Sequence, residues 1–103
     1  GDPRQRRAMS LIERSLDRPL EIHALAREVG ISHNQLTRIF RANLDETVIG
    51  YIRRRRVERA VHLLTATDLP IGTIAARVGI PDAHAFNKTV RAIAGRAPRD
   101  FRT

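Results

Sequence analysis

The chain has 103 residues, enough for one small domain or for two very small ones that share an element. Its hydrophobic share of 42% is ordinary for a folded domain, so the 29% of charged residues does not predict disorder. The net charge of +8 favours a polyanionic partner, with nucleic acid ahead of an anionic membrane. Disulfides and thiolate metal sites are excluded because cysteine is absent. The sequence shows neither a signal peptide nor an apolar run of the roughly 20 residues that span a bilayer.

Residues 2 to 18 are predicted to form a first helix. Asp2 can cap this helix, and Pro3 suits its first position. Pro19 prevents it from continuing. We interpret it as a packing helix with a basic exterior, because one face repeats apolar side chains at helical spacing, namely Ala8, Leu11, Ile12 and Leu16.

Residues 25 to 40 have the pattern of a helix-turn-helix, in which helices at 21–29 and 32–43 flank a short turn. Gly30 can take the left-handed conformation that ends the first helix, and Ser32 can cap the second. Side chains suited to contact bases or phosphates are expected on the outward face of the second helix, at His33, Asn34, Thr37, Arg38 and Arg41. A plain helical hairpin with a solvated polar face would show the same pattern. The pattern alone therefore does not decide between a DNA-binding motif and such a hairpin.

A long linker helix is predicted at 47–66, with Thr47 as its cap. Gly50 costs on the order of 1 kcal/mol there relative to alanine, so we expect it to mark close backbone packing. Arg56 falls on the apolar side, and an uncompensated buried charge is costly, so we predict a structural ion pair. Two outcomes, contact with phosphates or solvation, stay open for Arg53, Arg54 and Arg55.

The pattern then repeats. LAREVGI at 25–31 returns as IAARVGI at 74–80 with four of seven residues identical, and Gly79 takes the place of the turn glycine. Asp82 is the predicted cap of a second outward helix that runs to Ala94, and a short last helix begins at Pro98. The expected outward face of the second helix carries Ala83, His84, Asn87, Lys88 and Arg91. Two similar motifs argue against a generic hairpin, and two recognition helices at fixed spacing can enter major-groove segments about 34 Å apart.

On these residues the chain resembles the DNA-binding domain of the AraC/XylS family of bacterial transcription regulators. The match covers residues 5 to 102. Two departures are Asp45, where a glycine is usual, and Val90, where an aromatic is expected. The most specific part of the resemblance lies in the second module, at Ile74, Ala75, Gly79, Asp82, Phe86, Gly95, Pro98 and Phe101.

The resemblance implies an all-α fold of seven helices over residues 1–103, with helix-turn-helix modules at 4–43 and 70–102 around the linker. It also implies sequence-specific binding to double-stranded DNA, with activation of transcription more often than repression. The expected base-contacting residues are Asn34, Thr37, Arg38, His84, Asn87 and Lys88, with Ala83 at a further matched position. The expected phosphate contacts are Ser32, His33, Arg41 and Arg91, and the structural positions are Gly30, Arg56 and Gly79. We expect fewer base contacts from the second module, because Ala83 and Ala85 are short.

The resemblance further implies RNA polymerase as a partner, a separate effector-binding or dimerisation domain, and a place in the bacterial cytoplasm at the nucleoid. No metal site or cofactor is predicted, because the four histidines lack a ligand spacing. No nucleophile and base can be paired by spacing, so an enzyme is not expected. The alternative is a protein-interaction module whose basic faces bind an acidic partner.

Overall fold

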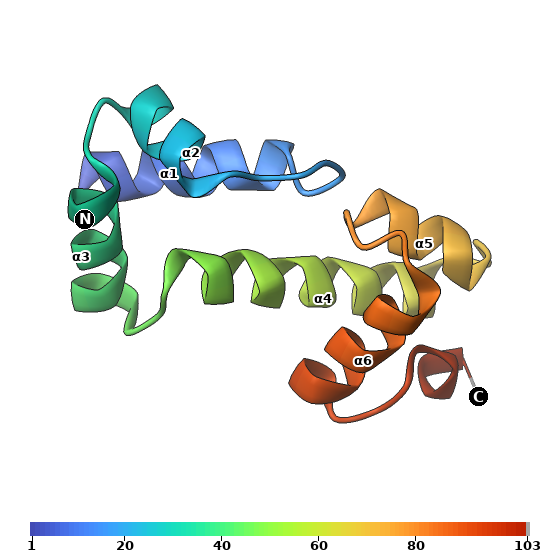
Figure 1. Cartoon of the computed structure of the whole chain (residues 1–103). Helices are drawn as coiled ribbons and strands as arrows, with labels where there is room; N and C mark the ends of the chain where they lie inside the picture. Colours follow the sequence, from blue (N-terminus) through green and yellow to red (C-terminus); the bar gives the residue numbers. More distant parts are fainter. Residues whose placement is uncertain (103) are drawn as a thin grey trace.

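Six α-helices and a final 3-10 helix make up the fold in a computed structural model, which describes residues 1–102 (Figure 1). Within that range there is no strand, so the all-α prediction is confirmed, and the seventh helix is the 3-10 helix. The helices are α1 (Pro3–Arg14), α2 (Ile22–Val29), α3 (His33–Leu44), α4 (Val48–Ala66), α5 (Ile71–Arg77), α6 (Ala83–Ala94) and η1 (Pro98–Arg102).

Helix α4 runs lengthwise through the molecule, with α1 to α3 at one end and α5, α6 and η1 at the other (Figure 1). The molecule is elongated, at 43 × 22 × 22 Å. The 19 residues of α4 account for about 28 Å of that length at 1.5 Å per residue. None of the helices in the described part of the chain is long and apolar enough to cross a membrane.

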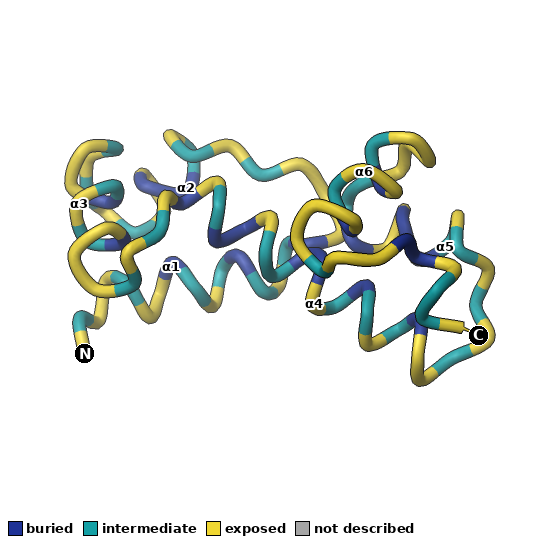
Figure 2. Tube along the Cα trace, turned by 90° about the horizontal axis from the view of Figure 1, so that it is seen from below, coloured by how far each residue is buried: buried dark blue, intermediate teal, exposed yellow. Residues whose placement is uncertain are grey.

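Each end of α4 has its own hydrophobic core, built on the inward sides of the helices (Figure 2). The first core gathers buried residues of α1, the segment after it, α2 and α3 around the start of α4, chiefly Ile12, Leu16, Leu25, Leu36, Phe40 and Tyr51. The second gathers buried residues of α5, the turn after it and α6 around the later part of α4, chiefly Val57, Leu64, Ile74, Val78, Phe86 and Val90. The two modules thus fold around separate cores and share α4.

The helix ends mostly follow the predicted caps. Ser32 and Gln35 form a reciprocal capping box at α3, and the Asp82 carboxylate accepts from the Ala85 N–H at 2.8 Å. The prediction of a first helix to residue 18 is wrong, because α1 ends at Arg14. There the Ser15 N–H donates to the Ile12 carbonyl at 3.0 Å, a tight turn that stops the α-helical ladder before the proline.

The role predicted for Gly50 also needs correction. Thr47 caps α4 by accepting from the Gly50 N–H at 2.9 Å, and a Cβ on Gly50 would lie 2.9 Å from the same Thr47 hydroxyl oxygen. Gly50 therefore lies against the Thr47 cap of its own helix, and it does not mark close packing with the backbone of another helix.

The two helix-turn-helix turns have the same geometry. Gly30 and Gly79 have φ of 84° and 76°, and the residue after each donates its N–H five residues back, Ile31 to Ala26 and Ile80 to Ala75. Asp45 ends α3 with φ 54°, as expected of a residue that tolerates the left-handed conformation better than most. The internal repeat in the sequence is therefore a repeat in the backbone.

Alanine at the two turn glycines should have unequal effects. Gly30→Ala should lower the free energy of unfolding by about 1–2 kcal/mol, since its Cβ would meet no atom within 4 Å and only the left-handed backbone is strained. Gly79→Ala should cost considerably more, because its Cβ would also collide with the Arg56 guanidinium and the Leu16 carbonyl. Urea denaturation measures both, with Gly72→Ala as the helical control. Equal losses at 30 and 79 would contradict this account.

Candidate nucleic-acid interface

The outer face of α3 presents a polar surface at one end of the molecule. Asn34, Arg38 and Arg41 are exposed, as predicted, whereas Thr37 is half-buried. Ser32 is exposed, but its hydroxyl accepts from the Gln35 N–H at 3.1 Å and its own N–H donates to the Gln35 side chain. Ser32 therefore serves first as the cap that starts α3.

His33 lies differently from the outward position predicted for it. It is half-buried, and its ring stacks on His23 of α2 with the centroids 4.5 Å apart and the planes at 24°. His23 itself is exposed. The stack connects the start of the second motif helix to the first across the turn, a contact between residues ten apart that no local pattern indicates.

The outer face of α6 is the counterpart at the other end. All five predicted outward residues, Ala83, His84, Asn87, Lys88 and Arg91, are exposed. Phe86 and Val90 face the second core, with 1% and 0% of their surface exposed. Val90 therefore still packs as a core residue, although the resemblance implies an aromatic at this position. One of these five outward positions is the short Ala83, so the face of α6 offers four long or polar side chains.

Two of the four consecutive arginines of α4 are paired with glutamates. Arg54 contacts Glu46 at 2.9 Å and Glu58 at 3.1 Å, and Arg55 contacts Glu13 at 2.8 Å and Glu58 at 2.6 Å. Hydrogen bonds from these arginines hold the pKa of all three carboxyls below the ordinary 4.5. Of the two outcomes left open by the sequence, plain solvation is wrong for these two side chains, and contact with phosphates stays a prediction.

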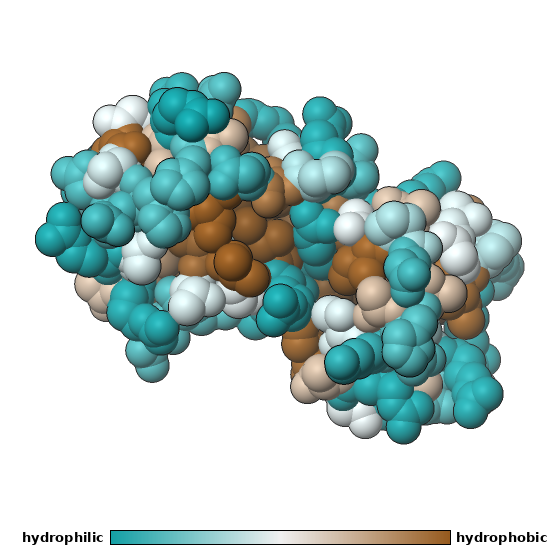
Figure 3. All heavy atoms as spheres, in the orientation of Figure 1, coloured by the Kyte–Doolittle hydropathy of each residue, from teal (hydrophilic) through white to brown (hydrophobic). Residues whose placement is uncertain are grey.

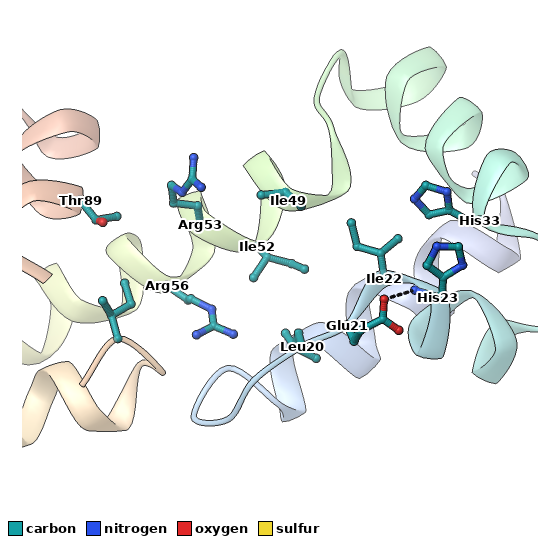
Figure 4. Close-up of a pocket in the computed structure, with 11 residues that line it drawn as sticks. Leu20, Glu21, Ile22, His23, His33, Ile49, Ile52, Arg53, Arg56 and Thr89 are labelled. Carbon is teal, nitrogen blue, oxygen red and sulfur yellow. Dashed lines mark hydrogen bonds between the residues drawn. The ribbon is translucent and has the colours of Figure 1, made fainter. Parts of the chain in front are cut away.

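A central groove of about 440 Å³ separates the two modules. Figure 3 shows hydrophobic atoms in the hollow between the two ends of the molecule. In Figure 4 the groove has His33 on one side and Thr89 of α6 on the other, and α4 runs between them. Its lining comes from both modules and α4: Leu20, Glu21, Ile22, His23, His33, Ile49, Ile52, Arg53, Arg56, Ile80 and Thr89.

Arg53 differs from its two paired neighbours. It is exposed and lines the central groove, and within residues 1–102 it forms no ion pair (Figure 4). Of the three arginines whose role the sequence left open, Arg53 is the one with an uncompensated charge on the groove side. Helical periodicity places Arg53 on a different side of α4 from Arg54 and Arg55, but it could not show which of the three would meet a glutamate.

Arg56 is the only buried charged side chain in the described part of the chain, with 9% of its surface exposed. The predicted ion pair is wrong. Its guanidinium donates instead to three backbone carbonyls, those of Gly79 at 2.7 Å, Arg18 at 2.9 Å and Val78 at 3.3 Å. Burial lowers the pKa of Arg56, and the carbonyl dipoles offset part of the cost of burying its charge. The structural role predicted for Arg56 agrees with these contacts.

Comparisons with known proteins match this architecture. Residues 25–103 match the model of a helix-turn-helix domain family. The regulatory protein SoxS of Escherichia coli K12 is 35% identical over 91 residues, which cover 88% of this chain and 85% of SoxS. The arabinose operon regulatory protein of the same strain is 31% identical over 102 residues, which cover 98% of this chain and 35% of that protein.

A solved structure with the same fold is that of a transcriptional regulator from Chromobacterium violaceum described as having an AraC-type DNA-binding domain. It superposes with a TM-score of 0.92 at 32% identity, covering 97% of this chain and 89% of that one. The chain belongs to the AraC/XylS family of transcription regulators and forms the DNA-binding domain of that family. Its function is therefore DNA binding in the control of transcription.

Acid should weaken the arginine–glutamate network. A carboxyl whose folded pKa is depressed stabilises the fold above its unfolded pKa, and this contribution is lost as the pH falls through the folded value. These three carboxyls should thus contribute fully above about pH 5 and lose that contribution below the ordinary pKa of 4.5.

Urea denaturation between pH 7 and pH 3 tests this expectation. A Glu13→Gln, Glu46→Gln double variant should be less stable at pH 7, by under about 1 kcal/mol per bridge because the pairs are partly exposed, and should show a shallower decline in acid. If the free energies of unfolding of the two proteins fell in parallel with pH, the network would not be the source of the loss of stability in acid.

Proposed function

We propose that α3 and α6 enter successive major-groove segments on one face of B-DNA, and that the domain regulates bacterial transcription from such sites, chiefly by activation. One observation carries the proposal. The two exposed polar helices occupy equivalent positions in two repeated modules, at opposite ends of one molecule 43 Å long. One turn of B-DNA is about 34 Å, so two helices so arranged suit two adjacent major-groove segments.

The side chains proposed to contact bases follow the residues on those faces. On α3 these are Arg38, suited to bidentate bonding of guanine, Asn34, suited to adenine, and Thr37. On α6 they are His84, Asn87 and Lys88, with Arg91, Ser32, His33 and Arg41 as the proposed phosphate contacts. The two helices should contribute unequally, because the first turn of α6 begins with alanines.

Arg53 is proposed as an additional phosphate contact between the two recognition helices. DNA that follows both helices must cross the central groove, where Arg53 is exposed with no carboxylate partner in the described chain. A phosphate placed there would gain a charge-assisted hydrogen bond.

The wider setting is also a proposal. This chain spans 35% of the length of the arabinose operon regulatory protein. That share supports a separate effector-binding or dimerisation domain in the intact regulator. We propose RNA polymerase as the protein partner in activation, and a role at the nucleoid as a regulator and not as an enzyme.

Selection of binding sites from random duplex DNA tests the proposed function. A recovered motif that spans about two turns of helix supports it. An unenriched pool would favour the alternative, a module whose basic faces bind an acidic protein. That alternative draws on the net charge of +8, but it leaves the two matched polar helices unexplained.

Arg38→Ala should weaken binding to the selected site by about 1–3 kcal/mol and barely change binding to unrelated duplex, because a base contact is lost. Arg14→Ala, which removes an equal charge from the exposed side of α1, is the matched control and should leave the ratio between the two duplexes unchanged. Fluorescence anisotropy at one fixed salt concentration measures all six affinities, those of the parent and the two variants on each duplex. Equal losses on both duplexes in the Arg38 variant would exclude a base contact.

Arg53→Ala should weaken binding to every duplex alike and should reduce the slope of log K against log salt by about 1, since one phosphate contact is lost. Arg54→Ala is the comparison on the same helix. Its slope should stay close to that of the unmodified domain, because Glu46 and Glu58 already balance the Arg54 charge. A salt titration from about 50 to 200 mM covers the useful range. Identical slopes in both variants would remove Arg53 from the interface.

A further inference from the structure

The two modules meet at a small polar contact where the hydrophobic cores stop. The first core ends along α4 at Ile52 and the second begins at Val57. Between them lie the four arginines, of which only Arg56 is buried. Apart from the continuity of α4, the contacts between the two modules are therefore expected around Arg56.

The hydrogen bonds of Arg56 reach both modules at once. Its Nη2 donates to the carbonyl of Arg18, in the segment after α1, at 2.9 Å. Its Nη1 donates to the carbonyl of Gly79, in the turn before α6, at 2.7 Å, and to that of Val78 at 3.3 Å. A guanidinium is planar and its donors point in fixed directions. Both carbonyl groups are thereby held in one position relative to α4 and to each other.

The backbones of the two modules also touch at this point. A Cβ on Gly79 would collide with the Leu16 carbonyl of the first module as well as with the Arg56 guanidinium. Glycine therefore permits the turn of the second module to rest directly on the end of the first. We call the set formed by Leu16, Arg18, Arg56, Val78 and Gly79 the inter-module joint.

We propose that Arg56 is a positioning residue that sets the distance and angle between the two recognition helices, and so determines the spacing of the two DNA subsites that the domain accepts. The inference rests on the proposed function, because it concerns how both helices engage one site. It assigns to Arg56 no contact with DNA. Its effect passes through the joint to α3 and α6.

The physical consequence is a fixed distance and angle between α3 and α6. Inserting one base pair between the subsites moves the second by about 3.4 Å and rotates it by roughly 34° about the DNA axis. A domain with an intact joint cannot follow that change, so it should bind a single spacing. A domain whose modules move about α4 can follow it, at the expense of affinity for the original spacing.

A distance measurement on the free protein tests the joint without DNA. The chain has no cysteine, so spin labels can be placed on cysteines introduced at Glu28 of α2 and Ala76 of α5, both exposed. Double electron–electron resonance should give a narrow distance distribution for the parent domain and a broader one for Arg56→Met. Arg56→Lys, with one ammonium in place of the planar fork, should fall between them. Arg59→Met, also on α4, is the control for charge loss and should match the parent.

The second measurement is binding to a spacing series of the selected site, with one base pair added or removed between the subsites. The parent and Arg59→Met should lose roughly tenfold or more in affinity at either change, whereas Arg56→Met should differ by less than about threefold across the series. Base preference within each subsite should be unchanged in Arg56→Met, which separates positioning from base contact. Circular dichroism confirms that each variant is folded.

Outcomes of the two measurements are distinguishable. Unchanged distance distributions and an unchanged spacing profile in folded Arg56→Met or Arg56→Lys would overturn the inference, as would a parent domain that accepts all spacings equally. Should Arg56→Met fail to fold, Arg56→Lys and the parent's spacing profile decide the same question. A selection that returns no DNA motif would defeat the proposed function, while the distance measurement would still report on the joint.

Discussion

A single buried guanidinium is the interaction on which the relation between the two halves of this domain depends. Each half folds around its own hydrophobic core, and apolar burial stabilises each separately. Arg56 lies in the gap between the cores and bonds only to backbone carbonyls. Burying a cation is costly. The three backbone carbonyls that bond Arg56 offset part of that cost, and all three are in place only when the two halves are docked. Docking and burial of the charge are therefore coupled.

The four consecutive arginines of α4 show how one residue type acquires different roles. Successive helical positions are 100° apart, so four neighbours point to four sides of the molecule. Two meet glutamates from α1, the α3–α4 connection and α4 itself, one faces the central groove, and one enters the joint. The count of four arginines accordingly overstates the positive charge that this run offers a partner, because glutamates balance Arg54 and Arg55. Of the four, Arg53 is the exposed arginine without a carboxylate partner in the described chain, and it lies at the central groove.

The features near the proposed DNA surface differ in how far the sequence could predict them. The outward residues of α6 were predicted correctly, because an amphipathic helix with a strong apolar face determines its own exposed side. Thr37 and His33 are both less exposed than predicted, and the burial of His33 depends on His23 of a neighbouring helix that periodicity does not reveal. The direct contacts of these residues with DNA remain predictions that the geometry supports.

The sequence by itself determined the all-α class, the caps and the left-handed turns, because these depend on residues within about five positions of one another, and it showed the repeat because both motifs keep the same residue types at the same spacing. It also carried the family resemblance, whose specific positions are mostly core residues and turn glycines. Only the tertiary structure decided the partners of Arg54, Arg55 and Arg56. The carbonyls that Arg56 bonds lie 22, 23 and 38 residues away, and every residue has such a carbonyl. A backbone acceptor leaves no side-chain signature, so the joint between the modules became visible only when the chain was folded.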